Sequence, residues 1–221
     1  MKIREIQLST TPTAEAINDL RLGDIVYLNG LLYTAREGIY MRVLDQGENV
    51  PMDLPRLSAA NFHCSPAATI HEDGTFDLGA ITATASFRFT KWLPTWMEKT
   101  GAKLIIGKGG MTSKDYKSYF VPNGAVYLST VGYGTGALLG RGVEKVEAVH
   151  WNEELGLAQA MWVIRCHKMG PFMVASDMNG DCLFERENAK INQNIEKLYE
   201  GTRPATLKRY GESDDRGDEV I

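Results

Sequence analysis

The stretch Lys103-Leu104-Ile105-Ile106-Gly107-Lys108-Gly109-Gly110-Met111 combines a short apolar run with a glycine-rich turn. The aliphatic residues from Leu104 to Ile106 predict a short buried strand. The glycines that follow allow positive φ and a close approach of the backbone to a ligand. Lys108 stands among them and presents a point charge that suits a carboxylate or a phosphate. The alternative is a tight strand-to-helix turn with a solvated lysine, and this stretch alone favours neither interpretation.

Two apolar runs upstream predict a β-hairpin that leads to a second cationic side chain. Residues 25–28 and 31–35 are apolar, and Asn29-Gly30 between them is a strong sequence signal for a tight turn. Arg36 follows the second run and precedes residues 37–44, which have the spacing of a short helix. An arginine between a strand end and a helix start is a candidate anion contact. The alternative is a surface arginine.

A run of small residues forms the third part of the candidate site. Residues 79–89 predict a strand, and Thr82-Ala83-Thr84-Ala85-Ser86-Phe87-Arg88 lies inside it. Small side chains allow a ligand to approach, and threonine hydroxyls are able to hydrogen-bond it or to exchange a proton with it. A threonine-rich strand without a ligand is an equally good interpretation of the same residues.

The remaining elements predict an α/β domain with a mixed sheet flanked by helices, because strands and helices alternate irregularly. Further strands are expected at 2–8, 62–70, 124–130, 143–151, 160–167 and 172–176, and helices at 13–20, 92–100, 113–119 and 185–199. Glycines at 132–136 resemble a dinucleotide fingerprint only weakly and are interpreted as a helix start. Residues 1–200 are expected to form a single domain, and the polar, acidic residues 201–221 a mobile tail or an arm that orders on a partner.

Composition limits the classes of function. The 221 residues are 43% hydrophobic and 24% charged, as in ordinary globular proteins. The formal net charge of -4 argues against a general binder of nucleic acid or membrane surfaces, and we expect neither a membrane span nor a signal peptide. Cys64, Cys166 and Cys182 are odd in number and widely spaced, which predicts reduced thiols in the cytoplasm. His63 and the other histidines are scattered and are interpreted as structural or surface residues.

The motifs together resemble a known family. In chain order they are Gly23-Asp24-Ile25-Val26, Thr34-Ala35-Arg36, Arg88, Ile106-Gly107-Lys108-Gly109-Gly110-Met111, Val149-His150-Trp151 and Gly170-Pro171. Their order and spacing, over residues 20–199, resemble the beta subunit, or C-terminal domain, of class I fumarate hydratase and of L(+)-tartrate dehydratase. Each motif is weak alone, and the resemblance rests on their arrangement.

The resemblance implies a fold, a partner and a cofactor. The implied fold is a swivelling β/β/α domain. The implied partner is an alpha subunit that carries a [4Fe-4S] cluster on three cysteines, with one iron open for the substrate, so that this chain binds no cofactor or metal alone. The active site would lie between the two subunits. We therefore expect a hetero-oligomer, or a homodimer of this chain in isolation, that acts on a small dicarboxylate in the cytoplasm.

The resemblance also implies roles for single residues. The family's basic residues that grip the dicarboxylate correspond to Arg36, Arg88 and Lys108, and its catalytic threonine corresponds to Thr84. Arginines clamp carboxylates with two parallel hydrogen bonds, and fixed positive charge stabilises the aci-carboxylate dianion of a dehydration. Thr84 would transfer the proton at carbon, its pKa lowered by Lys108 and the arginines. The implied activity is that of a hydro-lyase of the malate/fumarate or tartrate/oxaloacetate type.

Some neighbours of these residues depart from the family pattern. Glu37 and Tyr40 stand where the family has aspartate and histidine, and Ala85 stands where it has a second threonine. The retained charges favour a dicarboxylate, whereas the changed neighbours leave the identity of the substrate open. The alternative is a catalytically silent homologue that acts as an anion-binding scaffold or a regulatory subunit.

Overall fold

The computed structural model describes residues 3–132 and 134–201, and its centre is a seven-stranded mixed sheet. Across this sheet the order is β1 (Glu5–Ser9), β2 (Ile25–Thr34), β3 (Ala60–Phe62), β6 (Leu104–Gly107), β7 (Val126–Thr130), β9 (Met161–Ser176) and β8 (Val143–His150). A separate antiparallel hairpin consists of β4 (Cys64–Ile70) and β5 (Phe76–Ala83). The predicted α/β class with a mixed sheet flanked by helices is confirmed.

The strands β1, β2, β3, β6 and β7 run parallel, and β9 joins them in the antiparallel direction. β9 is long enough to pair with β8, with β2 and with β7. Because β9 pairs with both β2 and β7, the path from β2 through β3, β6, β7 and β9 closes on itself. The carboxyl ends of β2, β3, β6 and β7 meet at one edge of the sheet, and the candidate residues lie at this edge.

Short helices connect the strands, and a longer helix follows the last strand. The connecting helices are α1 (Ala14–Asn18), α2 (Glu37–Tyr40), α3 (Leu54–Leu57), α4 (Leu93–Thr100), α5 (Ser113–Asp115), α6 (Gly136–Gly140) and α7 (Asn152–Leu155), and the helix after β9 is α8 (Leu183–Tyr199). A 3₁₀ helix covers Ser86–Phe89, and π-helical turns extend α2 and α5 over Met41–Asp45 and Tyr116–Phe120. α5 begins with a capping box, because Thr112 accepts from the Asp115 N–H while Asp115 accepts from the Thr112 N–H.

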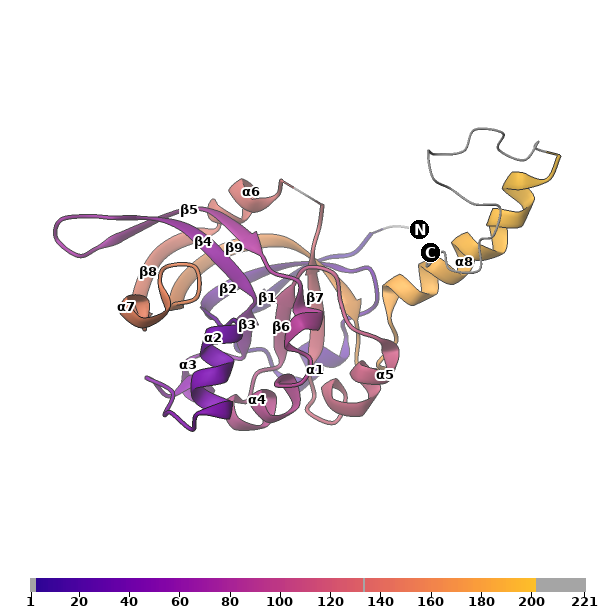
Figure 1. Cartoon of the computed structure of the whole chain (residues 1–221). Coiled ribbons are helices and arrows are strands. Elements are labelled where there is room, and N and C mark those ends of the chain that lie inside the picture. The colour runs from indigo at the N-terminus through magenta and orange to yellow at the C-terminus, as the bar shows by residue number, and fades with distance from the viewer. Residues whose placement is uncertain (1–2, 133, 202–221) are drawn as a thin grey trace, which may run out of the picture. The chain divides into compact units, whose positions relative to one another are not determined.

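Both faces of the parallel strands are buried. Leu104 and Ile106 of β6 pack into one apolar cluster and Ile105 into another, and all three side chains have 0% exposure. Leu139 of α6 belongs to the first cluster, and Trp96 of α4 belongs to the second. Figure 1 shows α2, α3, α4 and α5 on one side of the sheet, and the β4–β5 hairpin with α6 on the other. The alternation of side chains along each strand thus supplies two cores.

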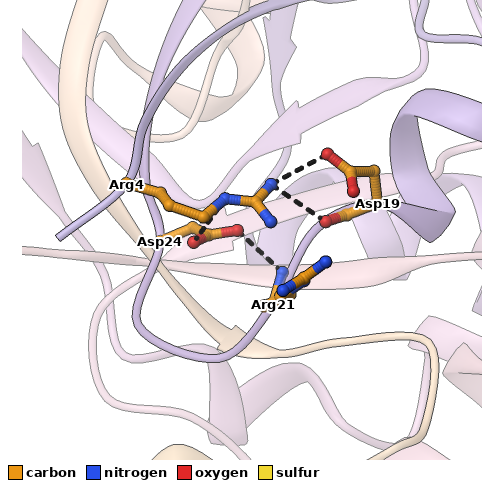
Figure 2. Close-up of polar contacts among 4 residues, drawn as sticks. All are labelled: Arg4, Asp19, Arg21 and Asp24. Carbon is orange, nitrogen blue, oxygen red and sulfur yellow. Dashed lines mark hydrogen bonds and ion pairs between the residues drawn. The ribbon is translucent and has the colours of Figure 1, made fainter. Parts of the chain in front are cut away.

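A cluster of charged residues ties the chain ahead of β1 to the entry of β2 (Figure 2). The Arg4 guanidinium lies 2.8 Å from the Asp19 carboxylate and 3.3 Å from the buried Asp24 carboxylate. Asp24 also accepts a hydrogen bond from the Arg21 backbone N–H at 2.8 Å. These contacts give Asp24 a structural role at the start of β2.

The predicted hairpin at Asn29-Gly30 is wrong, because β2 continues through both residues. Gly30 has a φ of 122°, and a Cβ there would lie 2.4 Å from Thr10 Oγ1, so the glycine permits a close approach of two segments. The Asn29 side-chain oxygen accepts a hydrogen bond from the Lys168 N–H at 2.8 Å. The register of β2 against β9 shifts on either side of Leu28. The Asn-Gly pair therefore marks an irregularity inside a strand rather than a turn.

The strand predicted for residues 79–89 is also too long, because β5 ends at Ala83. After Ala83 the backbone leaves β4 and forms an isolated parallel bridge between Ala85 and Lys108. Arg88 consequently lies in the 3₁₀ helix and not in a strand. This correction matters for the site, because it places Thr84 and Arg88 in a connecting segment.

The separate strands predicted for 160–167 and 172–176 are one strand, β9. Gly170-Pro171 does not interrupt the pairing, since Met169 lies opposite Leu28 and Phe172 lies opposite Val26. A proline is tolerated here because it sits beside a register irregularity of the ladder.

The chain forms a compact unit from Met1 to Arg186, and a second unit begins at Glu187 and includes most of α8. The prediction of a single domain over residues 1–200 stays a prediction. The tail predicted for residues 201–221 lies, apart from Gly201, outside the described residues. None of the described helices is long and apolar enough to cross a membrane.

Candidate functional site

The candidate residues lie where strands end. Arg36 comes two residues after β2 and precedes α2, Lys108 directly follows β6, and Thr84 directly follows β5. β2 and β6 are parallel strands on either side of β3, so their carboxyl ends share one edge of the sheet. The carboxyl ends of parallel strands are where α/β proteins, with open or closed sheets, commonly bind ligands.

Backbone hydrogen bonds hold Thr84 against Lys108. The Lys108 N–H donates to the Thr84 carbonyl at 3.1 Å, and the Ser86 N–H donates to the Lys108 carbonyl at 3.3 Å. The Thr84 N–H donates to the His63 carbonyl at 2.6 Å, which continues the edge toward β3. Thr84 is only 8% exposed, and its hydroxyl makes no hydrogen bond to the part of the chain that the structure describes. That hydroxyl is therefore available to a ligand.

The Lys108 side chain is exposed and lines two neighbouring hollows. One hollow has a volume of about 370 Å³ and is lined by small residues such as Thr82 and Thr135. The other has a volume of about 390 Å³ and is lined by Phe87 and Phe184. Neither of these two hollows is lined by Arg36, Thr84 or Arg88. A small anion beside Lys108 would thus have apolar and small side chains around it, with the arginines outside.

The two arginines lie close to each other around Glu37. Arg36 is half-buried, and its Nη1 donates to the Ala158 carbonyl at 2.6 Å. Arg88 Nη2 lies 3.4 Å from Glu37 Oε2, and both side chains are about half exposed. The pKa of Arg36 is lowered, chiefly by burial, while the charge of Arg88 also lowers it and Cys64 and Glu37 raise it. Two guanidinium groups with one carboxylate leave a net positive charge at this place.

His63 and Cys64 connect the arginines to the Thr84–Lys108 pair. Burial lowers the pKa of His63 and raises the pKa of Cys64, and the nearby positive charge of Arg36 acts on both groups as a smaller, lowering influence. The His63 carbonyl accepts the Thr84 N–H. The structure thus brings Arg36, Thr84, Arg88 and Lys108 to the same edge of the sheet, although in two groups.

A chain of buried polar side chains lies behind this edge. Asn61 Nδ2 donates to the Tyr40 hydroxyl at 2.7 Å, and this hydroxyl lies 2.7 Å from His63 Nε2. His63 Nδ1 lies 2.7 Å from Ser86 Oγ. All four residues have 0% exposure. Burial, and to a lesser degree the charge of Arg36, lowers the pKa of His63 to about 3, so the imidazole is neutral at physiological pH.

The chain of polar groups continues to the Lys108 backbone. The Tyr127 hydroxyl lies 2.8 Å from Ser86 Oγ and 3.2 Å from the Lys108 carbonyl oxygen. Tyr127 is also fully buried, and burial raises the pKa of its hydroxyl far above the usual range. Gly107 permits this packing, because a Cβ at that position would lie 2.0 Å from Ser86 Oγ. We name the side chains of Tyr40, His63, Ser86 and Tyr127 the buried relay.

The buried relay was not predicted from the sequence. His63 was interpreted as structural or surface, and Tyr40 was noted only as a departure from a family pattern. The signals were a histidine and an asparagine inside an apolar run at residues 60–64, and a serine after the threonine-rich run. Each is common in isolation, and only the fold brings them into contact.

The three cysteines do not form a metal site. Cys64, Cys166 and Cys182 are buried and unpaired, and burial raises the pKa of Cys166 to about 12 and that of Cys64 further. Within residues 3–132 and 134–201 no group of three or more histidine, cysteine or acidic side chains is placed to hold a metal ion. Because an iron–sulfur cluster needs several cysteine thiolates side by side, these separated cysteines do not fit one.

The fold and the site define an α/β protein with cationic side chains at the carboxyl edge of its parallel strands. The family model for the fumarase C-terminus matches residues 1–187. The chain belongs to this family, and the predicted resemblance is confirmed.

Relatives of known description extend this result. The chain is 32% identical over 188 residues to the L(+)-tartrate dehydratase subunit beta of Escherichia coli strain K12, covering 84% of this chain and 89% of that protein. It is 32% identical over 189 residues to the putative L(+)-tartrate dehydratase subunit beta of Methanocaldococcus jannaschii, covering 84% and 94%. It is also 32% identical over 201 residues to the putative fumarate hydratase class I of Geobacillus stearothermophilus, of which it covers 37%.

Proposed function

We propose that this chain is the beta subunit of a hydro-lyase that removes water reversibly from a small hydroxy-dicarboxylate. Family membership and the descriptions of the relatives support the reaction class. The observation that carries the proposal for this chain is the gathering of three cationic side chains and one unbonded hydroxyl at a single sheet edge. Tartrate or malate is the substrate, and the two relatives described as tartrate dehydratase beta subunits favour tartrate.

The proposed mechanism assigns binding to the arginines. Arg36 is half-buried and anchored to the Ala158 carbonyl, so it presents a fixed guanidinium to one carboxylate of the substrate. Arg88 is half exposed and held only by Glu37, so it is able to turn toward a carboxylate that offers two parallel hydrogen bonds. A dianionic substrate thus replaces the single carboxylate of Glu37 between the two cations.

The proton transfer is assigned to Thr84 and Lys108. When the carbon next to a carboxylate loses its proton, negative charge develops on that carboxylate, and the Lys108 ammonium stabilises it because no acidic side chain in the described residues neutralises Lys108. Thr84 takes up this proton in its alkoxide form, and hydroxide leaves from the neighbouring carbon as the C=C forms, so that proton and hydroxide together make up the water removed. The low exposure of Thr84 keeps bulk water away from the proton in transit.

The proposal also requires a partner chain in the cytoplasm. We propose that an alpha subunit holds a [4Fe-4S] cluster, because the described residues of this chain do not fit one, and that the two chains form a hetero-oligomer. No step above depends on the cluster. The buried thiols agree with a reducing compartment.

The test is anaerobic co-expression with an alpha chain of the same enzyme family, followed by an assay of water removal from tartrate and malate. Thr84→Ala, Arg88→Ala and Lys108→Ala should each lower kcat/KM about 100-fold or more while the complex stays folded. Lys99→Ala on the exposed face of α4 is the matched control and should leave turnover unchanged. Wild-type rates in all three variants would show that Thr84, Arg88 and Lys108 do not act in catalysis. A complex that binds dicarboxylates without turnover would establish the silent scaffold instead.

A further inference from the structure

We propose that the buried relay positions Lys108 and Thr84 for the reaction, so that Tyr40, His63, Ser86 and Tyr127 are positioning residues; this inference rests on the function proposed above. The relay touches neither hollow beside Lys108. It ends instead on the Lys108 carbonyl, next to the two backbone hydrogen bonds that join Lys108 to the segment of Thr84. Its influence on a substrate therefore passes through these two residues.

The first half of the relay has a fixed direction. Asn61 Nδ2 carries only protons, so the Tyr40 oxygen accepts there and its own proton is left for His63 Nε2. A neutral imidazole that accepts at Nε2 carries its proton on Nδ1 and donates it to Ser86 Oγ. Asn61 Oδ1, at the start of this chain of contacts, is buried without a hydrogen-bond partner in the part of the chain that the structure describes.

The second half of the relay joins Ser86 to Lys108 through Tyr127. Ser86 Oγ accepts from His63 Nδ1 and also from the Tyr127 hydroxyl at 2.8 Å. The Tyr127 hydroxyl donates in addition toward the Lys108 carbonyl at 3.2 Å. The chain of contacts thus ends on the backbone of a candidate catalytic residue.

The relay is rigid because its surroundings are packed. The Tyr40 ring contacts Trp92 in a stacked arrangement and Trp96 edge-on, with centroid distances of 5.7 and 5.0 Å. The His63 ring packs against Phe89 with the centroids 4.9 Å apart. Fully buried polar groups that lose a partner have no water to replace it, so a break at either end of the relay should propagate toward Lys108.

Ser86 couples the relay to both candidate residues. Its hydroxyl belongs to the relay, and its N–H donates to the Lys108 carbonyl. The Thr84 carbonyl, two residues earlier, accepts the Lys108 N–H. A displacement of the Ser86 side chain thus changes the separation of the Thr84 hydroxyl from the Lys108 ammonium, and a shift of about 1 Å is enough to lower a rate about 100-fold.

The experiment compares Tyr40→Phe and Tyr127→Phe with Tyr33→Phe. Tyr33 is an equally buried tyrosine whose hydroxyl donates to Thr100 at 3.4 Å, outside the relay, so it controls for the loss of a buried hydroxyl. Each variant is measured in the complex with the alpha chain for kcat and KM. Each is also measured as the isolated chain for hydrogen exchange at the Lys108 amide, which donates to Thr84.

For both relay variants we expect kcat to fall about 10- to 100-fold with KM nearly unchanged, since the relay acts on groups that work in the transition state. Exchange at the Lys108 amide should become about tenfold faster or more, and Tyr33→Phe should change neither quantity. Relay variants that melt earlier but keep kcat and the Lys108 exchange rate would overturn the proposal. If the wild-type complex shows no turnover, the proposed function fails, and the exchange comparison alone then decides whether the relay holds Lys108.

Discussion

His63 shows at the scale of one residue how burial turns a common side chain into a pH-dependent element. Its pKa is lowered to about 3, whereas an unfolded histidine titrates near the ordinary value of 6.5. The unfolded chain therefore binds more protons between these values, and the stability that His63 contributes is present above pH 6.5 and is lost as the pH falls. The free energy of unfolding should decrease by up to about 1.4 kcal/mol per pH unit on this account.

The variant His63→Gln tests this expectation. Glutamine offers one acceptor and a donor but does not titrate, so it is able to bond Tyr40 and Ser86 without the pH dependence. Urea denaturation of the isolated chain at pH 7 and pH 4.5 should show a smaller loss of stability at pH 4.5 for the variant than for the wild type. Equal losses in the two proteins would mean that His63 is already free to titrate in the folded state.

Glu37 forms an ion pair with Arg88, and this contact leads to a prediction about affinity. Arg88 Nη2 and Glu37 Oε2 are 3.4 Å apart and about half exposed. A substrate carboxylate must compete with Glu37, so Glu37→Gln should tighten dicarboxylate binding, by up to about fivefold because exposed pairs contribute up to about 1 kcal/mol. Titration of the complex with tartrate measures this change, and Glu98→Gln on α4 is the control. Weaker binding in Glu37→Gln would show that Glu37 orients Arg88 rather than competes for it.

At the scale of elements, the sequence correctly predicts the strands that are marked by a run of apolar residues. The apolar run Leu104–Ile106 became β6, and the polar edge beyond it carries Lys108 as expected. The errors arose where a residue type has two uses. Asn29-Gly30 is common in tight turns, but here the pair forms an irregularity inside a strand. This second use is recognisable only when the close approach of Gly30 to Thr10 is known. The approach of Arg88 to Glu37 likewise depends on tertiary packing, which no local pattern encodes.

The end of β6 illustrates a second element-scale constraint, which gives another prediction. A Cβ at Gly107 would lie 2.0 Å from Ser86 Oγ and 3.0 Å from both the Thr84 carbonyl oxygen and the Tyr127 hydroxyl. Gly107→Ala should therefore lower the free energy of unfolding by about 1–3 kcal/mol, the usual range for an overpacked site. Chemical denaturation at pH 7 measures this.

Gly79 in β5 supplies the matched control. A Cβ there meets no atom closer than 3.7 Å, so Gly79→Ala should change stability by no more than about 0.5 kcal/mol, as exposed substitutions do. If Gly107→Ala proved as mild as Gly79→Ala, the packing between β6 and the buried relay would be looser than the structure describes.

At the scale of the whole molecule, all candidate site residues lie on one side of the compact unit. The cationic side chains come from one sheet edge, and no described group of side chains is placed to hold a metal ion. Both faces of the parallel strands are covered, so the candidate residues lie at the carboxyl ends of the strands and not on a face of the sheet. This arrangement explains why the sequence indicated the chemistry of the site through its charged residues but not the complete pocket.

The compact unit ends near the point where the family match ends, and this leads to a prediction about truncation. The unit runs to Arg186 and the match to residue 187, while Ile191, Ile195 and Leu198 of α8 are 57%, 41% and 72% exposed. Removing them gives up little buried apolar surface. A chain of residues 1–190 should therefore unfold cooperatively, with a free energy of unfolding within about 1 kcal/mol of the full chain.

The contact that the truncated chain must keep is the one between Glu185 and Ser113. Glu185 Oε1 accepts the Ser113 N–H at 2.9 Å, and this hydrogen bond lowers the pKa of the Glu185 carboxyl. Glu185→Ala within the chain of residues 1–190 should thus destabilise it by about 1 kcal/mol more, since the first turn of α5 loses its side-chain partner. Thermal and urea denaturation of the full chain, of the chain of residues 1–190 and of its Glu185→Ala variant measures the effect of the truncation and of the substitution. If the truncated chain unfolded without cooperativity, residues 191–221 would be an integral part of the fold. That outcome would favour the predicted single domain over residues 1–200, which includes α8.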